Sequence, residues 1–349
     1  MLPCGCYNTK YEKDVAIMRT KTQWGLLIGF CIFALIFPPL LFGRHMLSWL
    51  DHTLIIIIAV LGLHILTGLG GQISIGQSAF MAVGAYTTGI MVAHYGISYW
   101  ICLPCSGMMA GLIGLFFGIP SLKVKGFYLA IATLAAQFII MWAIGHLRFL
   151  TGGMEGMTVP APTLGGIRFD SSKSMFFIIM PITMLMGYLA KNISRTRVGR
   201  ALIAIRDNDL AAEVLGINVF RYKLLAFFSC SFFAGIAGWL FAPYTIHIAP
   251  ASFSLMDSIW MLGMLVVGGM GSVVGAIAGT IALRALNEVL MVNAPILASI
   301  FGGSSNFYDA LPSLVFGLVI ILFLVFEPRG LNHRWEIFKS TYRLYPFSY

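Results

Sequence analysis

The sequence KNISRTRVGRALIAIRDNDLAAEVLGINVFRYK, residues 191–223, lies between two long apolar runs at 174–190 and 224–243. It holds ten of the 35 Lys, Arg, Asp and Glu residues of the chain. Basic residues gather in the cytoplasmic loops of membrane proteins, so its basic residues alone are typical of any polytopic protein. The acidic residues and a helical pattern within the loop indicate a further role.

That pattern predicts a short amphipathic helix from about Asp207 to Leu215, ended by Gly216. Asp209 and Glu213 are four residues apart and therefore share one helix face. Glycine is a common residue directly after the end of a helix. The apolar positions of the pattern are Leu202, Ile205, Leu210, Val214 and Leu215.

The composition is that of an integral membrane protein. Hydrophobic residues make up 59% of the 349 residues, charged residues 10%, and the mean hydropathy is +0.89. Soluble domains contain about 25% charged residues. The net charge of +9 does not indicate nucleic-acid binding, because the basic residues lie at the ends of apolar runs, where they orient the chain and meet anionic lipid.

Ten apolar runs are long enough to cross a hydrocarbon core of about 30 Å. We therefore expect an all-α, polytopic membrane protein with about ten transmembrane helices, within a range of nine to eleven. Only GGMGS (Gly268–Ser272) separates the eighth and ninth runs, so one long helix, or one span with a re-entrant element, would also fit there. The runs are 24–42, 52–69, 78–95, 99–119, 127–149, 174–190, 224–243, 257–271, 273–291 and 309–326.

The charged loops predict the orientation of these spans. With an uncleaved N-terminal segment, 1–23, in the cytoplasm, ten spans place the loop 191–223 and the tail 327–349 on the same side. Lys123 and Lys125 also fall there. The membrane domain is then 24–326, and the segments 150–173, 244–256 and 292–308 face the opposite side.

GLGGQISIGQSAFMAVGAYTTG, from Gly68 to Gly89, brings polar side chains and glycines into an apolar region. Irregular backbone at membrane depth needs protein or water to satisfy its amides. We interpret the segment as a broken helix or re-entrant turn beside a solute path. A short turn followed by a closely packed helix is the alternative. The residues expected to line or support the path are Gln72, Ser74, Gln77 and Ser78.

GGMGSVVGAIAG, from Gly268 to Gly279, has a similar pattern in the second half of the chain, which suggests a weak internal repeat.

Chemistry carried by the chain itself is not indicated. No phosphate-binding G-x-x-x-x-G-K-[ST] motif and no set of nucleophile, base and orienting residue occurs, so we expect no enzyme activity and no cofactor. Cys102 and Cys105 form a C-x-x-C, but the absence of further ligands nearby favours buried thiols over a metal site. A weak metal contact at Cys4 and Cys6 is the alternative for the N-terminal pair.

Ionisable residues within the expected spans are few, which disfavours an ion-coupled carrier. Arg284 and Glu288, four positions apart, are expected to form a structural ion pair. Two further candidates are His64, interpreted as a satisfied interior imidazole, and Asp257, at an expected interface.

Six segments resemble, in order, the inner-membrane permease of bacterial branched-chain amino acid ABC importers. The resemblance covers most of the chain from about 50 to 331. The segments are GLGGQISIGQSAFMAVGAYTTG, GFYLAIATLAAQFI (126–139), LTGGMEGMTV (150–159), VGRALIAIRDNDLAAEVLGINVFRYKLLAF (198–227), GGMGSVVGAIAG and FGLVIILFLVFEPRGL (316–331).

The resemblance implies a multi-pass protein of the bacterial inner membrane, with both termini in the cytoplasm. It implies four kinds of partner: a paralogous permease subunit, two cytoplasmic ATP-binding subunits, a periplasmic solute-binding protein and the lipid bilayer. The expected solutes are leucine, isoleucine and valine. Urea, short amides and other amino acids are alternatives, and so is a stand-alone ion-coupled transporter.

The resemblance also makes the loop 191–223 the element that docks on the ATPase. We expect its acidic residues to pair with basic groups of that partner, and Arg197, Arg200 and Arg206 to face phosphates or lipid. The residues assigned to coupling are Arg206, Asp207, Asp209, Glu213 and Gly216. The N-terminal segment and the tail have no counterpart in the family, and the aromatic residues Trp335, Phe338, Tyr342 and Tyr345 suggest an interfacial helix in the tail.

Overall fold

The computed structural model describes residues 21–121, 127–164, 167–301, 305–327, 330–332, 334 and 337–338. Lys123, Lys125, Cys4, Cys6 and most of the aromatic tail lie outside these residues, so the predictions that concern them stay predictions.

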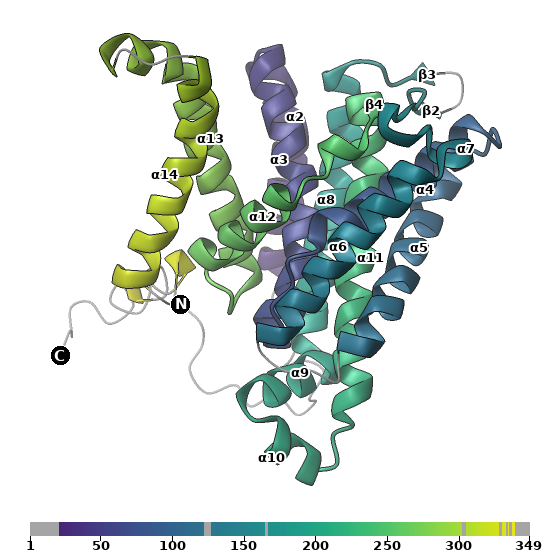
Figure 1. Ribbon diagram of the computed structural model, residues 1–349. Helices are drawn as coiled ribbons and strands as arrows, with labels where there is room; N and C mark the ends of the chain where they lie inside the picture. Colours follow the sequence, from purple (N-terminus) through teal and green to yellow (C-terminus); the bar gives the residue numbers. More distant parts are fainter. Residues whose placement is uncertain are drawn as a thin grey trace.

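The described chain is a bundle of helices with short strands at one end (Figure 1). Its long helices are α2 (Lys21–Leu41), α3 (Arg44–Leu63), α4 (Gln77–Ala93), α5 (Tyr99–Ser121), α6 (Phe127–His146), α8 (Ser172–Arg195), α11 (Val219–Thr245), α12 (Leu255–Gly268), α13 (Val273–Phe301) and α14 (Ser305–Phe326). The short helical elements are η1 (His64–Leu69), α7 (Arg148–Thr151), η2 (Gly153–Glu155), α9 (Arg197–Asp207), α10 (Asp209–Val214) and η3 (Pro250–Ser252).

Seven helical segments of the described residues are long and apolar enough to cross a membrane. They coincide with the expected spans at 52–69, 99–119, 127–149, 174–190, 224–243, 257–271 and 273–291. The other three expected spans fall on α2, α4 and α14, of which α4 has 17 residues. The all-α, polytopic class is therefore confirmed, and the count of ten stays a prediction.

The glycine-rich region around Gly268 is a turn between two helices, α12 and α13, which form a hairpin. The helix α12 ends at Gly268, and Gly269, with φ +105°, turns the chain before α13 begins. A Cβ atom on Gly279 would overlap the backbone of Gly268, so the two helices approach each other backbone to backbone. One uninterrupted helix across 257–291 is excluded.

The helix α11 is at the centre of the bundle, between α3, α4 and α5. Four glycines of α5 recur at helical spacing and face α11, at Gly107, Gly111, Gly114 and Gly118. Added Cβ atoms there would crowd the side chains of α11, which include Phe228. Small residues let membrane helices pack closely, which stabilises an interface where lipid removes most of the hydrophobic driving force.

Short strands join the segments expected on the side opposite to the loop 191–223. The strand β1 (Met157–Thr158) pairs antiparallel with β4 (His247–Ile248), and β2 (Thr163–Leu164) pairs with β3 (Ile167–Arg168). Figure 1 shows β2, β3 and β4 at the upper end of the bundle and α9 and α10 at the lower end. The segments 150–173 and 244–256 therefore lie together, at the end of the molecule away from the charged loop.

Candidate functional site

The chain turns back between η1 and α4, because α3 and η1 together form a complete span, Arg44–Leu69, that ends beside α9 of the charged loop. A turn between two helices therefore fits, and one broken helix does not. The helix α3 continues as a π-helical turn to Leu69, residues 70–76 are irregular, and α4 begins at Gln77. Gln72, Ser74, Gln77 and Ser78 are all at most 5% exposed. In the isolated chain, these four polar residues lie among helices and not on an open surface.

Gln77 connects two helices. Its Nε2 donates to the carbonyl oxygen of Ala59 on α3 at 2.7 Å, and its Oε1 accepts from Sγ of Cys230 on α11 at 3.1 Å. Each end of the buried amide therefore has a protein partner, which removes most of the cost of burying it.

Ser78 is the centre of a second network, with residues of α6 and α12. Its backbone N–H donates to Oγ of Ser258 at 2.9 Å, and its Oγ accepts from Nε2 of Gln137 at 2.9 Å. The next amide, of Ala79, donates to Oε1 of Gln137 at 3.0 Å. The first N–H groups of a helix have no partner within the helix, so side chains of α6 and α12 satisfy those of α4.

The network places the start of α4 at mid-depth of the bundle, because Gln137 lies at the middle of α6 (Phe127–His146). The helix α12 begins beside it: Ser254, which caps α12, accepts through its carbonyl oxygen from Oγ of Ser78 at 2.8 Å. Two helix N-termini therefore meet inside the bundle. Gln137 and Ser258 were missed from the sequence, although a polar side chain inside an apolar run was a signal for both.

Asp257 has a local structural role. Its Oδ2 accepts from the backbone N–H of Ser254 at 2.8 Å, and its own N–H donates to Oγ of Ser254 at 3.2 Å. This is a capping box, which satisfies two N-terminal amides of α12.

The charged loop contains two helices, and the second, α10, is the helix predicted from about Asp207 to Leu215. The helix α9 ends at Asp207, and α10 begins at Asp209. Between them Asn208 is extended, and its Oδ1 accepts from the N–H of Ala211 at 3.0 Å. The apolar pattern that begins at Leu202 is thus divided at Asn208, because an asparagine side chain competes for backbone amides and favours a new helix start.

The predicted helix end at Gly216 is confirmed. Gly216 has φ +83°, its N–H donates to the carbonyl of Glu213, and the N–H of Ile217 donates to the carbonyl of Ala212. This pair of hydrogen bonds is the Schellman motif. It orients the short segment that leads into α11.

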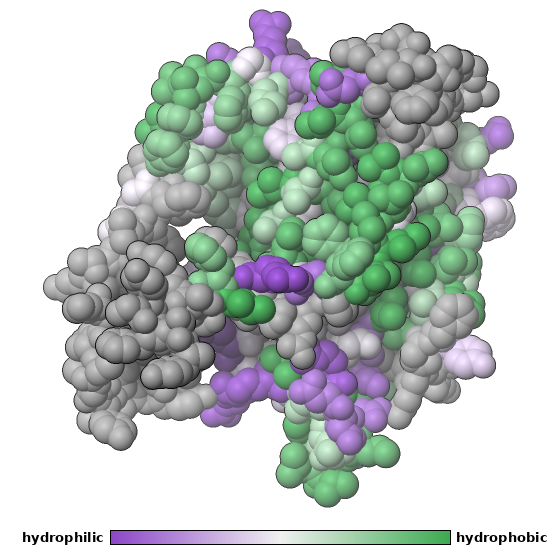
Figure 2. Space-filling model, turned by 90° about the vertical axis from the view of Figure 1, so that its left-hand side faces the viewer, coloured by the Kyte–Doolittle hydropathy of each residue, from purple (hydrophilic) through white to green (hydrophobic). Residues whose placement is uncertain are grey.

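The predicted apolar face of the loop is divided between two environments. Leu202 and Ile205 of α9 are buried against the bundle. Leu210, Val214 and Leu215 are 67%, 88% and 78% exposed. Figure 1 places α10 at the lower tip of the molecule, and Figure 2 shows the corresponding lower end as a green, hydrophobic surface beside purple, hydrophilic atoms.

Three of the charged residues assigned to coupling have contacts within the chain. Asp209 lies 3.8 Å from Nζ of Lys223, and Asp207 accepts from Arg206. The guanidinium of Arg206 is turned inward and donates to the carbonyl oxygen of Gly68 at 2.9 Å. Its expected direction, toward phosphates or lipid, was wrong, because a carbonyl at the end of a helix lacks a partner within the helix and attracts a cation.

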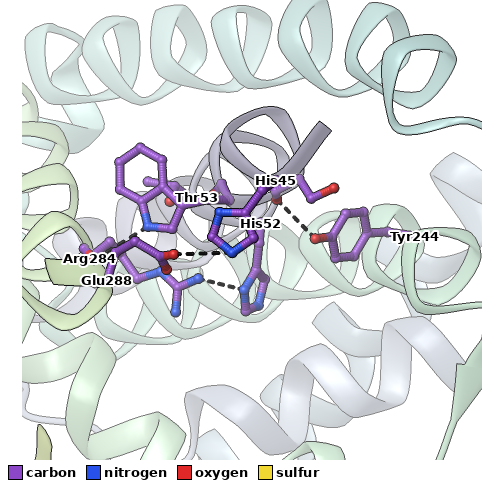
Figure 3. Close-up of polar contacts among 8 residues, drawn as sticks. His45, His52, Thr53, Tyr244, Arg284 and Glu288 are labelled. Carbon is purple, nitrogen blue, oxygen red and sulfur yellow. Dashed lines mark hydrogen bonds and ion pairs between the residues drawn. The ribbon is translucent and has the colours of Figure 1, made fainter. Parts of the chain in front are cut away.

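Polar residues also meet near the opposite end of α3 (Figure 3). Nη2 of Arg284 lies 2.6 Å from Nδ1 of His52, and Oε1 of Glu288 lies 3.5 Å from Nε2 of His45. Tyr244 donates to the carbonyl of Ser48 at 2.9 Å. Arg284 and Glu288, expected to pair with each other on α13, thus each contact a histidine of α3 and tie the two helices together.

Of the other singled-out residues, His64 is fully buried in η1. Cys102 and Cys105 are free thiols in α5, the first buried and the second partly buried. The glycine-rich segments compared as a possible repeat lie against each other, since a Cβ atom on Gly68 would overlap the carbonyl oxygen of Met270.

A bundle of apolar helices, interrupted at mid-depth by a polar segment and carrying an exposed amphipathic loop at one end, is typical of multi-pass membrane transport proteins. Residues 45–324 match the family described as the permease component of the branched-chain amino acid transport system. The chain therefore belongs to this family.

Similar proteins agree with that assignment. The chain is 30% identical over 336 residues to the high-affinity branched-chain amino acid transport system permease protein LivM of Escherichia coli, covering 89% of this chain and 75% of that protein. It is 29% identical over 317 residues to LivM of Salmonella typhimurium, covering 84% and 71%. A more distant relative is the fructose import permease protein FruG of Bifidobacterium longum, 26% identical over 298 residues, covering 80% and 81%. No solved structure matches the chain.

Proposed function

We propose that the chain is the transmembrane permease subunit of an ABC importer that carries leucine, isoleucine or valine inward, with ATP hydrolysed by partner subunits. The observation that carries this proposal is the family match over residues 45–324. A fructose import permease is among the relatives, so the experiment below compares leucine with other solutes.

The partners we propose are a second, paralogous permease subunit, two cytoplasmic ATP-binding subunits and a periplasmic solute-binding protein. The exposed tip of α10 supports the contact with the ATPase. Apolar side chains 67–88% exposed on a charged loop lose contact with water when a partner covers them, which favours association. The membrane would be the bacterial inner membrane, with both termini in the cytoplasm.

The polar break is our candidate for the solute path. Transporters often place their sites where interrupted helices meet at mid-depth, because helix N-termini attract anionic groups such as a carboxylate. The starts of α4 and α12 at Ser78 and Ser254 have that arrangement. The hydrogen bonds of Gln77 and Ser78 favour a supporting role for these two side chains, which hold the helix starts in place.

The test is uptake by proteoliposomes that contain the complete assembly. Labelled leucine should accumulate only with ATP inside, the binding protein outside and an active ATPase. A variant ATPase that binds but does not hydrolyse ATP is the control. Uptake of urea or fructose but not leucine would replace the solute, whereas uptake by this chain alone under an ion gradient would contradict the ABC mechanism.

A further inference from the structure

Arg206 joins the charged loop to the polar break across 138 positions of sequence. Its Nη1 donates to the carbonyl oxygen of Gly68, one residue before the end of η1. The last carbonyls of a helix lack partners within the helix, and a guanidinium is well suited to bind them. Arg206 therefore acts as a C-terminal cap of the helix formed by α3 and η1, supplied by another element.

The stem of Arg206 also fits the chain after the break. Gly71 has φ +66°, and a Cβ atom there would lie 2.6 Å from Cγ of Arg206. A larger residue at 71 would be strained in this backbone conformation and would push the arginine away. One side chain thus contacts the residues on both sides of Leu69, where the helix stops.

The guanidinium of Arg206 also binds the carboxylate of Asp207. Its Nε and Nη2 both donate to Oδ1 of Asp207, at 3.1 and 3.0 Å. The preceding residue, Ile205, is buried against the bundle. A pocket of about 340 Å³ lies between α9 and the break, and Gly70, Gly71 and Gln72 line it together with Arg206.

We propose that Arg206 is a positioning residue that transmits movement of α9 and α10 to the polar break. When the ATPase displaces the loop, the hydrogen bond to Gly68 and the contact with Gly71 carry that displacement to residues 70–76, which lead into α4. This inference rests on the proposed ABC mechanism, because the displacing force comes from the ATPase. Arg206 need not contact the ATPase itself.

The first test uses the whole transporter, purified with its partner subunits and reconstituted in proteoliposomes. Arg206→Met keeps much of the apolar stem and removes the donors. We expect assembly and ATP hydrolysis to persist while leucine uptake per ATP falls about tenfold or more, as the loss of a charged donor implies. Arg206→Lys, which keeps a donor for Gly68 but not the paired contacts with Asp207, should recover part of the coupling.

The matched control is Arg200→Met on the same helix. Arg200 is exposed, and its Nη1 donates to the carbonyl of Arg195 within the loop. Its coupling ratio should stay within about twofold of the unsubstituted transporter. A normal ratio in Arg206→Met would overturn the inference and leave the proposed function intact, whereas absence of any co-purified ATPase would overturn both.

A second measurement does not depend on the methionine variant folding. A Cβ atom built on residue 71 would lie 3.2 Å from Cβ of Arg206, slightly below the roughly 3.5–4.5 Å of disulfides, so the two positions are near enough to cross-link after a small shift. In Gly71→Cys with Arg206→Cys, oxidation should cross-link the pair to similar extents in the nucleotide-free and the ADP–vanadate-trapped transporter, because a contact that carries the displacement must persist while the loop moves. Each single-cysteine variant is a control for the native thiols. Cross-linking in the nucleotide-free state that is lost in the trapped state would overturn the inference, because α9 would then move away from the break without displacing it.

Discussion

The polar residues of the break are held by side chains distant in sequence. Gln77 and Ser78 bind partners on α3, α6, α11 and α12, so each hydrogen bond joins helices rather than stabilising one helix. In an apolar medium an unpaired amide or hydroxyl is costly, and this cost makes the arrangement of partners specific. Substitution of a single residue should therefore affect several helices.

Gln77→Ala and Ser78→Ala should each lower the free energy of unfolding by about 1–3 kcal/mol and reduce leucine uptake, because buried partners lose their hydrogen bonds. Thermal unfolding in detergent and uptake in proteoliposomes measure the two effects. Thr88→Val is the matched control, since Thr88 is buried in α4 but bonds only to the carbonyl of Gly84 in its own helix. Unchanged uptake and unchanged solute-stimulated ATPase activity in both alanine variants would refute the proposed path.

Gly238→Val should destabilise the crossing of α4 and α11. A Cβ atom on Gly238 would overlap the carbonyl oxygen of Met81, and backbone atoms cannot move away as a flexible side chain can. Overpacking of this kind costs about 1–3 kcal/mol, measured as a lower unfolding temperature. The control is Gly317→Ala in α14, where no atom lies within 4 Å. An equal unfolding temperature in Gly238→Val would contradict the close approach of the two helices.

At the scale of elements, one helix of the loop 191–223 is attached to the bundle, and the other is exposed to a partner. The helix α9 is attached to the bundle by Leu202 and Ile205, whereas α10 projects with its apolar residues exposed. The side chain of Asn208 caps the start of α10, and the Schellman motif at Gly216 fixes its far end. A short helix held at both ends can transmit a push with little internal bending.

Val214→Ser together with Leu215→Ser should weaken the association with the ATPase by about tenfold or more and leave the unfolding temperature nearly unchanged. Both side chains are at least 78% exposed, so they contribute little to the fold, and their burial on binding would be lost. Affinity for the ATPase subunit can be measured by titration in nanodiscs. Met154→Ser, 76% exposed in η2, is the control and should bind normally. Normal affinity in the double variant would place the interface elsewhere.

Gly216→Val and Glu213→Gln should uncouple ATP hydrolysis from uptake without unfolding the spans. At φ +83° a β-branched residue is disfavoured by roughly 1–2 kcal/mol, which is enough to disturb the end of α10, although no atom within 4 Å opposes its Cβ. Glu213 is exposed and is expected to pair with the ATPase. The ratio of uptake to ATP hydrolysis is the measurement, and a normal ratio in both variants would reduce the loop to an orienting element.

At the scale of the whole molecule, the two ends of the bundle differ in charge and in secondary structure. One end carries the charged loop, and the other carries the paired strands β1 and β4 with the short elements around them (Figure 1). The basic residues of the loop predict that its end faces the cytoplasm.

Cysteine labelling can test this orientation. Val214→Cys should react with a membrane-impermeant maleimide only from the cytoplasmic side, in inside-out vesicles, and Met154→Cys only from the opposite side, in intact cells. Both positions are more than three-quarters exposed, so in cells and vesicles that lack the ATPase subunits access depends on the side of the membrane. The unsubstituted chain corrects for its native thiols. Labelling of both positions from the same side would contradict the predicted parity of the spans.

The sequence by itself determined the class of fold, the irregular segment before Gln77 and the helix end at Gly216. These features depend on apolar run length, on helical period and on glycine, which are properties of neighbouring residues. The sequence did not predict the break between α9 and α10 at Asn208, where the side chain accepts a hydrogen bond from a backbone N–H of the loop.

Only the tertiary structure decided which polar groups meet. Arg206 binds Gly68 over 138 positions, and Arg284 contacts His52 over 232. Gln137 and Ser258, on different helices, both bind Ser78. Local pattern places a polar residue on a helix, but its partner depends on how the helices cross, and that follows from close packing at glycines spread along the whole chain.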